Sequence, residues 1–378
     1  MTAATSTTLA DGRELIYFDD GAMAKPHPER DRRPLLPRSD EDTGEIRFDA
    51  LTGDWVAVAT RRQTRTYLPP ANQCPLCPST AENLSEIPGP NYDVAVFENR
   101  FPSLGPALGM APSTPGWGTS GTGFGRCEVV SFTSDHTGSF GSLPPQRART
   151  VIDAWAARTE ALSAMPGIRQ VFPFENRGEE IGVTLHHPHG QIYAYPYLPP
   201  RAAVMAGAAR RFFDAADGRL TLTGSILGSE RSAGDRMIAE GRHFSAYVPF
   251  AAHWPLEVHL TPHRQVADIA GLTGPERDEL ASMYLDLLGR LDNLYATPTP
   301  YIAAWHQAPV DDYFRPASYL HLQLTSPRRS ADKLKFLAGS EAAMGAFIND
   351  STPERAASAL RDAGAHSKAS ASTGGRTQ

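Results

Sequence analysis

One succession of patterns occurs twice in this 378-residue chain, and the duplication restricts the fold more than any other feature. In the first copy "CEVVSFTSDH" is followed by "LPPQRARTVIDAWAARTEAL", "GIRQVFPFENRG" and "HHPHGQIYAYP". In the second copy "HFSAYVPFAAHWPLEVHLTP" is followed by "LTGPERDELASMYLDLLGRL", "YIAAWHQAP" and "SYLHLQLTSP". Each copy predicts a strand, an amphipathic helix and two further strands.

The two helical segments place apolar residues at helical spacing, and the flanking segments alternate as half-buried strands do. The apolar positions are Val151, Ile152, Trp155 and Leu162 in one helix, and Leu280, Tyr284, Leu287 and Leu288 in the other. Two such repeats predict an α+β fold, in which antiparallel sheet carries a packed helix on one face. The alternation does not decide whether the two sheets merge.

The chain divides into four predicted parts. Residues 1–40 contain "AKPHPERDRRPLLPRSD" and are expected to form an extended arm with little core of its own. Residues 41–198 and 199–350 hold the two halves, and residues 351–378 are expected to form a helix and a disordered polar tail. The Gly-, Pro-, Ser- and Thr-rich residues 104–123 are expected to form a long loop between strands.

Composition excludes several functional classes. The net charge of −6 argues against a broad basic surface for nucleic acid, and no apolar run approaches the ~18 residues of a membrane span. The first residues, "MTAATSTTLADGRELIYFDD", lack the basic and apolar segments of a signal peptide. We therefore expect a cytoplasmic protein that binds neither nucleic acid nor membrane.

Three cysteines, Cys74, Cys77 and Cys127, are too few and of the wrong parity for a disulfide framework. Two of them form "CPLC", a spacing that suits metal binding or redox chemistry. Plain loop thiols are the alternative interpretation of the same pair.

The segment "HPHGQIYAY" clusters imidazoles on a predicted strand. Alternation places four side chains on one side of it: His187, His189, Gln191 and Tyr193. Taken singly, either histidine could be a packed core residue of a half-buried strand. However, Pro188 removes a backbone donor and Gly190 lets another group approach the backbone closely, and both features suit a ligand site better than a strand interior.

This pentapeptide, "HPHGQ" at 187–191, with "FENRGEEIGVTL" before it, resembles the galactose-1-phosphate uridylyltransferase family of the histidine-triad superfamily. The resemblance runs from about residue 47 to about residue 341. It includes "CPLC", "VFENRF", "TSDH", "VPFAAHWPLEVHLTP", "AAWHQAP" and "KFLAGSE". It implies two tandem histidine-triad-like αβ repeats, and a homodimer whose sites use residues of both chains.

The resemblance also implies a reaction. His189 would attack the α-phosphorus of UDP-glucose, expel glucose-1-phosphate and hold UMP until galactose-1-phosphate accepts it, giving UDP-galactose by a ping-pong mechanism. In the hydrolase branch of the superfamily a histidine takes the place of Gln191. Because both leaving group and acceptor are sugar phosphates, a neutral amide can bind phosphoryl oxygens without activating water.

For metals, the resemblance adds His136 and His187 to Cys74 and Cys77 as a structural zinc site. A second site, filled by iron in some members, would use four positions: His306, His321, Gln323 and Met205. Gln323 replaces a histidine and Met205 replaces a glutamate there, so we expect the iron site to be absent.

Substrate contacts are implied at further positions. They are Arg62 and Arg65 for phosphate, Asn99 and Arg100 for uridine, Asn176, Gly182, Val183 and Thr184 beside the α-phosphate, and Lys335, Phe336, Ser340 and Glu341 for the sugar. For "RRQTR" a solvated basic loop is the alternative. The family often has Cys-Ser-Asn at residues 183–185, and an aromatic residue where Ser340 stands, so hexose selectivity is the least defined property.

Two other functions remain open from sequence alone. One is an ADP-glucose or dinucleotide phosphorylase of the same superfamily, which nucleotide preference would distinguish. The other is a non-catalytic, zinc-stabilised nucleotide-binding protein, which covalent labelling of His189 would exclude.

Overall fold

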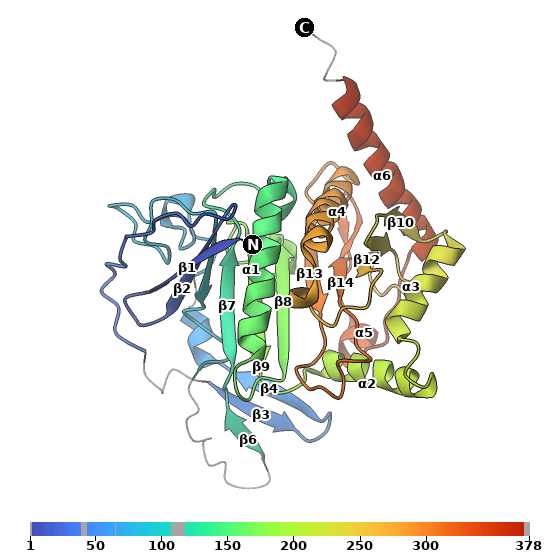
Figure 1. Ribbon diagram of the computed structural model, residues 1–378, viewed down its shortest axis with the longest axis horizontal. Helices are drawn as coiled ribbons and strands as arrows, with labels where there is room; N and C mark the ends of the chain where they lie inside the picture. The colour runs from blue at the N-terminus through green and yellow to red at the C-terminus, as the bar shows by residue number, and fades with distance from the viewer. Residues whose placement is uncertain (1, 39–43, 65, 107–117, 374–378) are drawn as a thin grey trace.

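A single large antiparallel sheet runs through the whole molecule. The computed structural model describes residues 2–38, 44–64, 66–106 and 118–373, with side chains to residue 364 except those of residues 61 and 64 (Figure 1). Eleven strands pair in the order β1-β2-β5-β7-β9-β8-β13-β14-β12-β11-β10. Their bounds are β1 Ala3–Thr8, β2 Glu14–Asp19, β5 Val94–Glu98, β7 Arg126–Ser131, β8 Gln170–Arg177, β9 His189–Tyr195, β10 Met237–Glu240, β11 Phe244–Tyr247, β12 Leu256–Pro262, β13 Tyr301–His306 and β14 His321–Ser326.

The two predicted repeats are present, and their sheets merge. The series β7, α1 (Pro145–Ser163), β8 and β9 recurs as β12, α4 (Gly274–Asn293), β13 and β14. Strand β8 pairs with β13 at the centre of the sheet, where Arg177 faces Tyr301 and Asn176 faces Ile302. This pairing answers the question that the alternation left open, and it confirms the predicted α+β class.

Helices α1 and α4 stand side by side on one face of the sheet (Figure 1). Helix α4 begins with a capping box, in which Glu276 N–H donates to Thr273 Oγ1 and the Glu276 carboxylate accepts from Thr273 N–H at 2.7 Å. Such a cap stabilises a helix by about 1 kcal/mol. All eight apolar positions predicted for the two helices are buried.

Aromatic rings join the two halves beneath these helices. Phe140 lies 5.7 Å from the Trp155 ring and 4.7 Å from the Tyr284 ring, and Trp305 lies 5.9 Å from Trp155. The main core is therefore continuous across both repeats.

The first twenty residues differ from the expected arm. Strands β1 and β2 pair along six residues each and extend the sheet at one edge, and Leu15, Tyr17 and Phe18 are buried. The short run "LIYF" is apolar enough to form a covered strand, so the prediction of little core was wrong there. Residues 20–38 contain neither helix nor strand, as an arm would.

The remaining elements surround this sheet. A three-stranded sheet of β4 (Asp54–Val58), β3 (Glu45–Asp49) and β6 (Ser120–Thr122) lies below it in Figure 1. Other elements are α2 Pro200–Ala215, α3 Leu222–Ala233, β15 Arg328–Ser330, β16 Lys333–Leu334, α5 Gly339–Met344 and α6 Pro353–Thr373. Most of the expected 104–123 loop and the last five residues of the expected tail lie outside the described residues.

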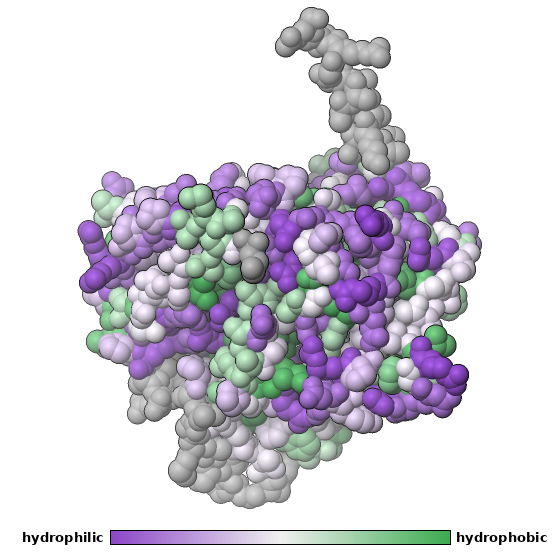
Figure 2. Space-filling model, viewed as in Figure 1, coloured by the Kyte–Doolittle hydropathy of each residue, from purple (hydrophilic) through white to green (hydrophobic). Residues whose placement is uncertain are grey.

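On the face shown in Figure 2, hydrophilic residues cover most of both halves, with small hydrophobic groups between them. Among the described residues, no helix combines the length and the apolarity that crossing a bilayer requires.

Candidate active site

A pocket of about 230 Å³ opens at the beginning of β9. Seven predicted site residues line it: Arg62, Asn176, Gly182, Val183, Thr184, His189 and Gln191. Phe174, Gly190 and Tyr193 line it as well, although no binding role was predicted for them. Tyr193 shares the alternation of His189 and Gln191, so its place was readable from the strand pattern.

His189 is held in one orientation by its own chain. Its Nδ1 donates to the carbonyl oxygen of His187 at 2.7 Å, which leaves the Nε2 lone pair available. Burial lowers the pKa of His189, although this hydrogen bond opposes the shift. The ring is therefore neutral and nucleophilic near pH 7.

Gly190 is required by close packing between the histidine and the glutamine. A Cβ atom at this position would lie 2.8 Å from Phe132 Cζ and 2.9 Å from the carbonyl oxygen of Phe174. Any larger residue would push β9 away from its neighbours, and residues of both β8 and β9 line the pocket.

A tight turn after β8 leads to one part of the pocket wall. Gly178 and Gly182 have φ of +107° and +85°, values that favour glycine over other residues. A short 3-10 helix, Glu179–Ile181, fits between them and ends at Gly182. This turn places residues 182–184 at the pocket.

Arg62 brings a cation to the same pocket. Its Nη1 donates to Ser103 Oγ at 3.0 Å and to Tyr193 Oη at 3.3 Å, both neutral oxygens. The guanidinium has no carboxylate partner among the described residues, so its charge is available to an anion. Arg65 lies outside the described residues.

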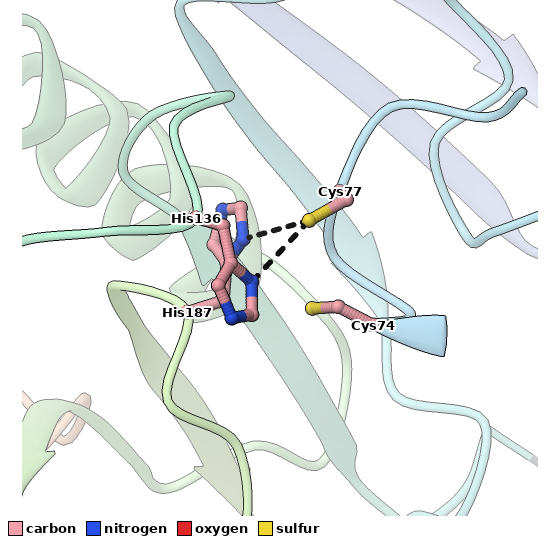
Figure 3. Close-up of side chains that lie close together, drawn as sticks. All are labelled: Cys74, Cys77, His136 and His187. Carbon is pink, nitrogen blue, oxygen red and sulfur yellow. Dashed lines mark hydrogen bonds between the residues drawn. The ribbon is translucent and has the colours of Figure 1, made fainter. Parts of the chain in front are cut away.

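Beside the pocket, Cys74, Cys77, His136 and His187 converge (Figure 3). Their ligand atoms all lie within 4.8 Å of one another, and Cys77 Sγ lies 3.4 Å from His136 Nδ1 and 3.5 Å from His187 Nδ1. In a tetrahedral zinc site, a sulfur ligand and a nitrogen ligand lie about 3.5 Å apart. Among the described residues this is the group whose donors fit a metal ion.

The other nitrogen of His187 is already bound, as a metal-ligating imidazole requires. Nε2 lies 2.7 Å from the carbonyl oxygen of Thr133 and 3.1 Å from the hydroxyl of Tyr92. Tyr92 also donates to the carbonyl of Leu76, inside the Cys-x-x-Cys turn, at 2.7 Å. Tyr92 was not predicted, and the sequence gives no signal for it.

In the second half, His321 repeats the position of His189. It begins β14, and its Nδ1 donates to the carbonyl oxygen of Tyr319 at 3.1 Å. The ring stacks on His306 with centroids 5.3 Å apart. Gln323 presents Nε2 to His321 Nε2 at 3.3 Å, because its Oε1 accepts from Arg201 at 2.7 Å. Met205 lies on α2.

Other predicted residues lie outside this pocket. Asn99 and Arg100 follow the end of β5. Lys335 is buried, pairs with Glu341 at 2.6 Å and donates to the carbonyl oxygen of His253 at 3.1 Å. Phe336 is 73% exposed, and Ser340 is also exposed. Within one chain, the 335–341 segment therefore does not reach the histidine.

Known proteins match this chain over most of its length. Sequence models described as galactose-1-phosphate uridyl transferase, N-terminal and C-terminal domains, match residues 36–199 and 213–371. A galactose-1-phosphate uridylyltransferase of Streptomyces lividans is 46% identical, covering 95% of this chain and 97% of that protein. One from Thermotoga maritima is 36% identical, covering 84% and 98%. A solved uridylyltransferase structure superposes with a TM-score of 0.75 at 29% identity, covering 85% and 99%. The chain belongs to the galactose-1-phosphate uridylyltransferase family.

Proposed function

We propose that this chain is a nucleotidyltransferase that moves UMP from UDP-glucose to galactose-1-phosphate, giving glucose-1-phosphate and UDP-galactose. One observation carries the proposal: His189 bonds through Nδ1 to the His187 carbonyl and lines a pocket together with Arg62 and Gln191. A neutral imidazole with one fixed nitrogen is a nucleophile that needs no separate base.

In the first step Nε2 of His189 attacks the α-phosphorus of UDP-glucose. The phosphorus–oxygen bond to glucose-1-phosphate breaks, and the leaving group departs as a stable phosphate anion. In the second step an oxygen of galactose-1-phosphate attacks the same phosphorus, and the phosphorus–nitrogen bond breaks. The imidazole returns to its neutral form, so neither step needs a proton from the protein.

Gln191 and Arg62 stabilise the phosphoryl group in both steps. Both line the pocket with His189. The Gln191 amide can donate to a phosphoryl oxygen but carries no proton that titrates near pH 7, so it does not activate water. Arg62, which donates to the neutral hydroxyls of Ser103 and Tyr193, supplies positive charge.

The decisive experiment uses UDP-glucose labelled in the α-phosphate. Without an acceptor, label should attach to His189 and about one glucose-1-phosphate per site should be released. Galactose-1-phosphate should then remove the label as UDP-galactose. Label that never attaches would leave a binding protein, whereas faster labelling from ADP-glucose than from UDP-glucose would identify a phosphorylase.

We infer that Cys74, Cys77, His136 and His187 hold a structural zinc ion. Thiolates and imidazoles are preferred zinc ligands, and the sulfur–nitrogen distances of 3.4 and 3.5 Å fit a tetrahedral ion. The ion would connect the "CPLC" turn to the loop that precedes β9, and so fix His189 two residues away. Elemental analysis should find about one zinc per chain.

The four residues at the position of the family's second metal site do not fit iron; they are His306, His321, Gln323 and Met205. An arginine bonds to Gln323, and the amide directs N–H rather than a lone pair toward His321. Both groups disfavour a cation beside the histidines. Stoichiometric iron in freshly purified protein would contradict this inference.

We propose a homodimer in which residues 335–341 complete the pocket of the second subunit. The pocket's volume of about 230 Å³ is below the ~300–1,000 Å³ of complete small-molecule sites. Phe336 is 73% exposed and is not among the residues that line the pocket of its own chain.

Complementation tests this arrangement. His189→Gly and Glu341→Gln proteins, each inactive or weak, should recover about a quarter of wild-type activity after unfolding and refolding together, because half of the dimers carry one intact site. A mixture that stays as inactive as its parents would place residues 335–341 outside the partner's site.

A further inference from the structure

The N-terminal segment, residues 9–38, contacts the end of β5 through two arginines. We propose that Arg38, supported by Arg13, is a positioning residue that fixes Asn99 for contact with the nucleoside. This inference rests on the proposed function, because it takes Asn99 as a nucleoside contact. It gives a role to a part of the chain for which the sequence indicated none.

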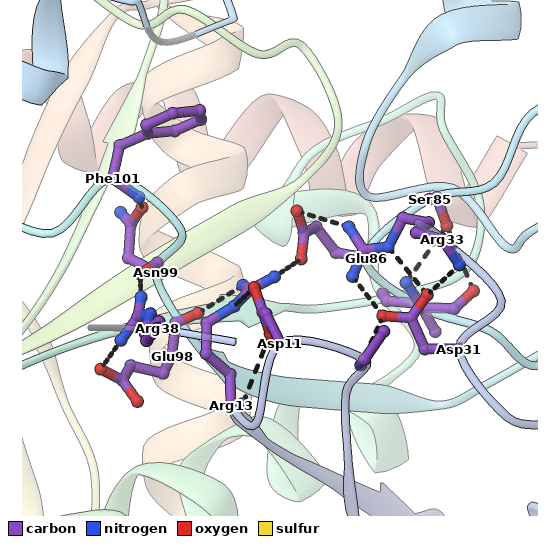
Figure 4. Close-up of polar contacts among 12 residues, drawn as sticks. Asp11, Arg13, Asp31, Arg33, Arg38, Ser85, Glu86, Glu98, Asn99 and Phe101 are labelled. Atoms are coloured by element: carbon purple, nitrogen blue, oxygen red, sulfur yellow. Dashed lines mark hydrogen bonds and ion pairs between the residues drawn. The ribbon is translucent and has the colours of Figure 1, made fainter. Parts of the chain in front are cut away.

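Two successive backbone carbonyls receive these arginines (Figure 4). Arg13 Nη1 donates to the carbonyl oxygen of Glu98 at 2.8 Å. Arg38 Nη2 donates to the carbonyl oxygen of Asn99, and its Nη1 pairs with the Glu98 carboxylate. Because the last residue of β5 and the residue after it are both bound, the backbone at residue 99 has little freedom to rotate.

Arg13 is itself immobilised. Its side chain is 0% exposed, and it pairs with Asp11 at 2.7 Å and with Glu86 at 2.5 Å. Arg33 completes the arrangement by pairing with Glu86 at 2.7 Å and with Asp31 at 2.7 Å. The segment is therefore attached to Glu86 by buried ion pairs at two of its residues, Arg13 and Arg33.

Buried ion pairs of this kind contribute little net stability, because desolvation of the charges offsets most of their attraction. Their effect is geometric, since a bidentate guanidinium accepts only a narrow range of partner positions. The network thus suits a positioning role better than a general stabilising one.

Asn99, whose backbone Arg38 binds, is connected to the pocket. Asn99 Oδ1 accepts from the Phe101 N–H at 2.9 Å, which orients the amide and leaves Nδ2 without a partner among the described residues. Two residues further, Ser103 Oγ accepts from Arg62, which lines the pocket. A free amide donor at this place suits an oxygen of a pyrimidine base or of a ribose.

Part of this arginine–carboxylate network lies outside the match to the family's N-terminal domain, whereas Arg38, Glu86 and Glu98 lie within it. Asp11, Arg13, Asp31 and Arg33 all precede residue 36, where the match to the family's N-terminal domain begins. The contacts themselves, and not the family signature, carry the proposal.

The test compares Arg38→Gln with Arg147→Gln. Arg147 binds Asp93 and Asp20 at the opposite end of β5, and its side chain is 15% exposed against 20% for Arg38. Each variant loses a guanidinium that binds two groups at one end of β5: Arg38 binds the Glu98 carboxylate and the Asn99 carbonyl, and Arg147 binds the carboxylates of Asp93 and Asp20. Only Arg38→Gln should lower kcat/KM for UDP-glucose, by about 10-fold, the loss of roughly one hydrogen bond. For galactose-1-phosphate, which meets an enzyme already carrying UMP, kcat/KM should stay within about two-fold.

Arg38→Lys keeps the variant informative if Arg38→Gln does not fold. Lysine can pair with Glu98, but a single ammonium cannot hold the carboxylate and the Asn99 carbonyl in the same fork. Its melting temperature should match that of the wild type, while kcat/KM for UDP-glucose falls at least about three-fold.

Equal effects of Arg38→Gln and Arg147→Gln, or equal losses for both substrates, would overturn the positioning role. A wild-type protein that transfers no UMP would instead overturn the proposed function. In that case calorimetric affinity for UMP, compared between wild type and Arg38→Gln, still decides whether the segment positions a nucleoside contact.

Discussion

Glu175 provides a quantitative test of the sheet behind the pocket. It lies in β8 between Phe174 and Asn176, which line the pocket, and its own carboxyl is buried. The hydroxyls of Tyr301 and Tyr284 donate to it at 2.7 and 2.9 Å. Burial raises the pKa of Glu175 from 4.5 to about 7, although both hydrogen bonds oppose the shift.

The sign of the stability effect follows from where the proton is held. Between pH 4.5 and 7 the folded chain keeps this proton while the unfolded chain releases it, so rising pH destabilises the fold. A shift of this size corresponds to about 3 kcal/mol at ~1.4 kcal/mol per pKa unit. Glu175→Gln imitates the protonated carboxyl and should remove this dependence.

The assay is urea unfolding of zinc-loaded wild type and Glu175→Gln across this pH range. The free energy of unfolding of the variant minus that of the wild type should increase by about 3 kcal/mol between pH 4.5 and 8. Protonation of zinc ligands affects both proteins equally and cancels.

Glu257→Gln is the control, because the pKa of this buried carboxyl is lowered and not raised. Burial raises the pKa of Glu257, but hydrogen bonds from His259 and from the His253 N–H together lower it by more, so the net shift is downward. Its difference curve should stay flat above about pH 5.5. A flat curve for Glu175→Gln as well would refute the reasoning about the buried carboxyl.

Three further predictions concern the pocket and the metal group. Cys74→Ser should lower zinc content, melting temperature and activity together; an unchanged melting temperature in zinc-free protein would contradict a structural ion. Gln191→His should slow transfer and increase UMP release from UDP-glucose without acceptor, and rapid release by the wild type would identify a hydrolase instead. Arg62→Ala should weaken use of both sugar phosphates by about 1.5–3 kcal/mol in kcat/KM, and unchanged kinetics would remove Arg62 from the site.

The sequence predicted the features that depend on local pattern. Alternation located His189 and Gln191 on one face of a strand, and helical spacing located the buried faces of α1 and α4. The resemblance brought together Cys74 and His136, which the chain separates by sixty-two positions and the fold brings within 4.8 Å.

Long-range contacts without a local pattern could not be predicted. Strand β2 reads as a short apolar run in a polar segment, and only its pairing with β5 makes it part of the core. Tyr92 and Arg38 act through partners distant in sequence, so no spacing rule indicates them. Residues 335–341 match the family, yet one chain alone does not bring them to the pocket.

The continuous ladder through β8 and β13 has a mechanical consequence. Hinge motions rotate domains about loops, whereas here the two halves are joined by backbone hydrogen bonds in the middle of one sheet. Rotation of one half against the other would break that ladder, so the halves move as one body. Two different sugar phosphates must therefore use the same rigid recess in turn, and the first has to diffuse out before the second can enter.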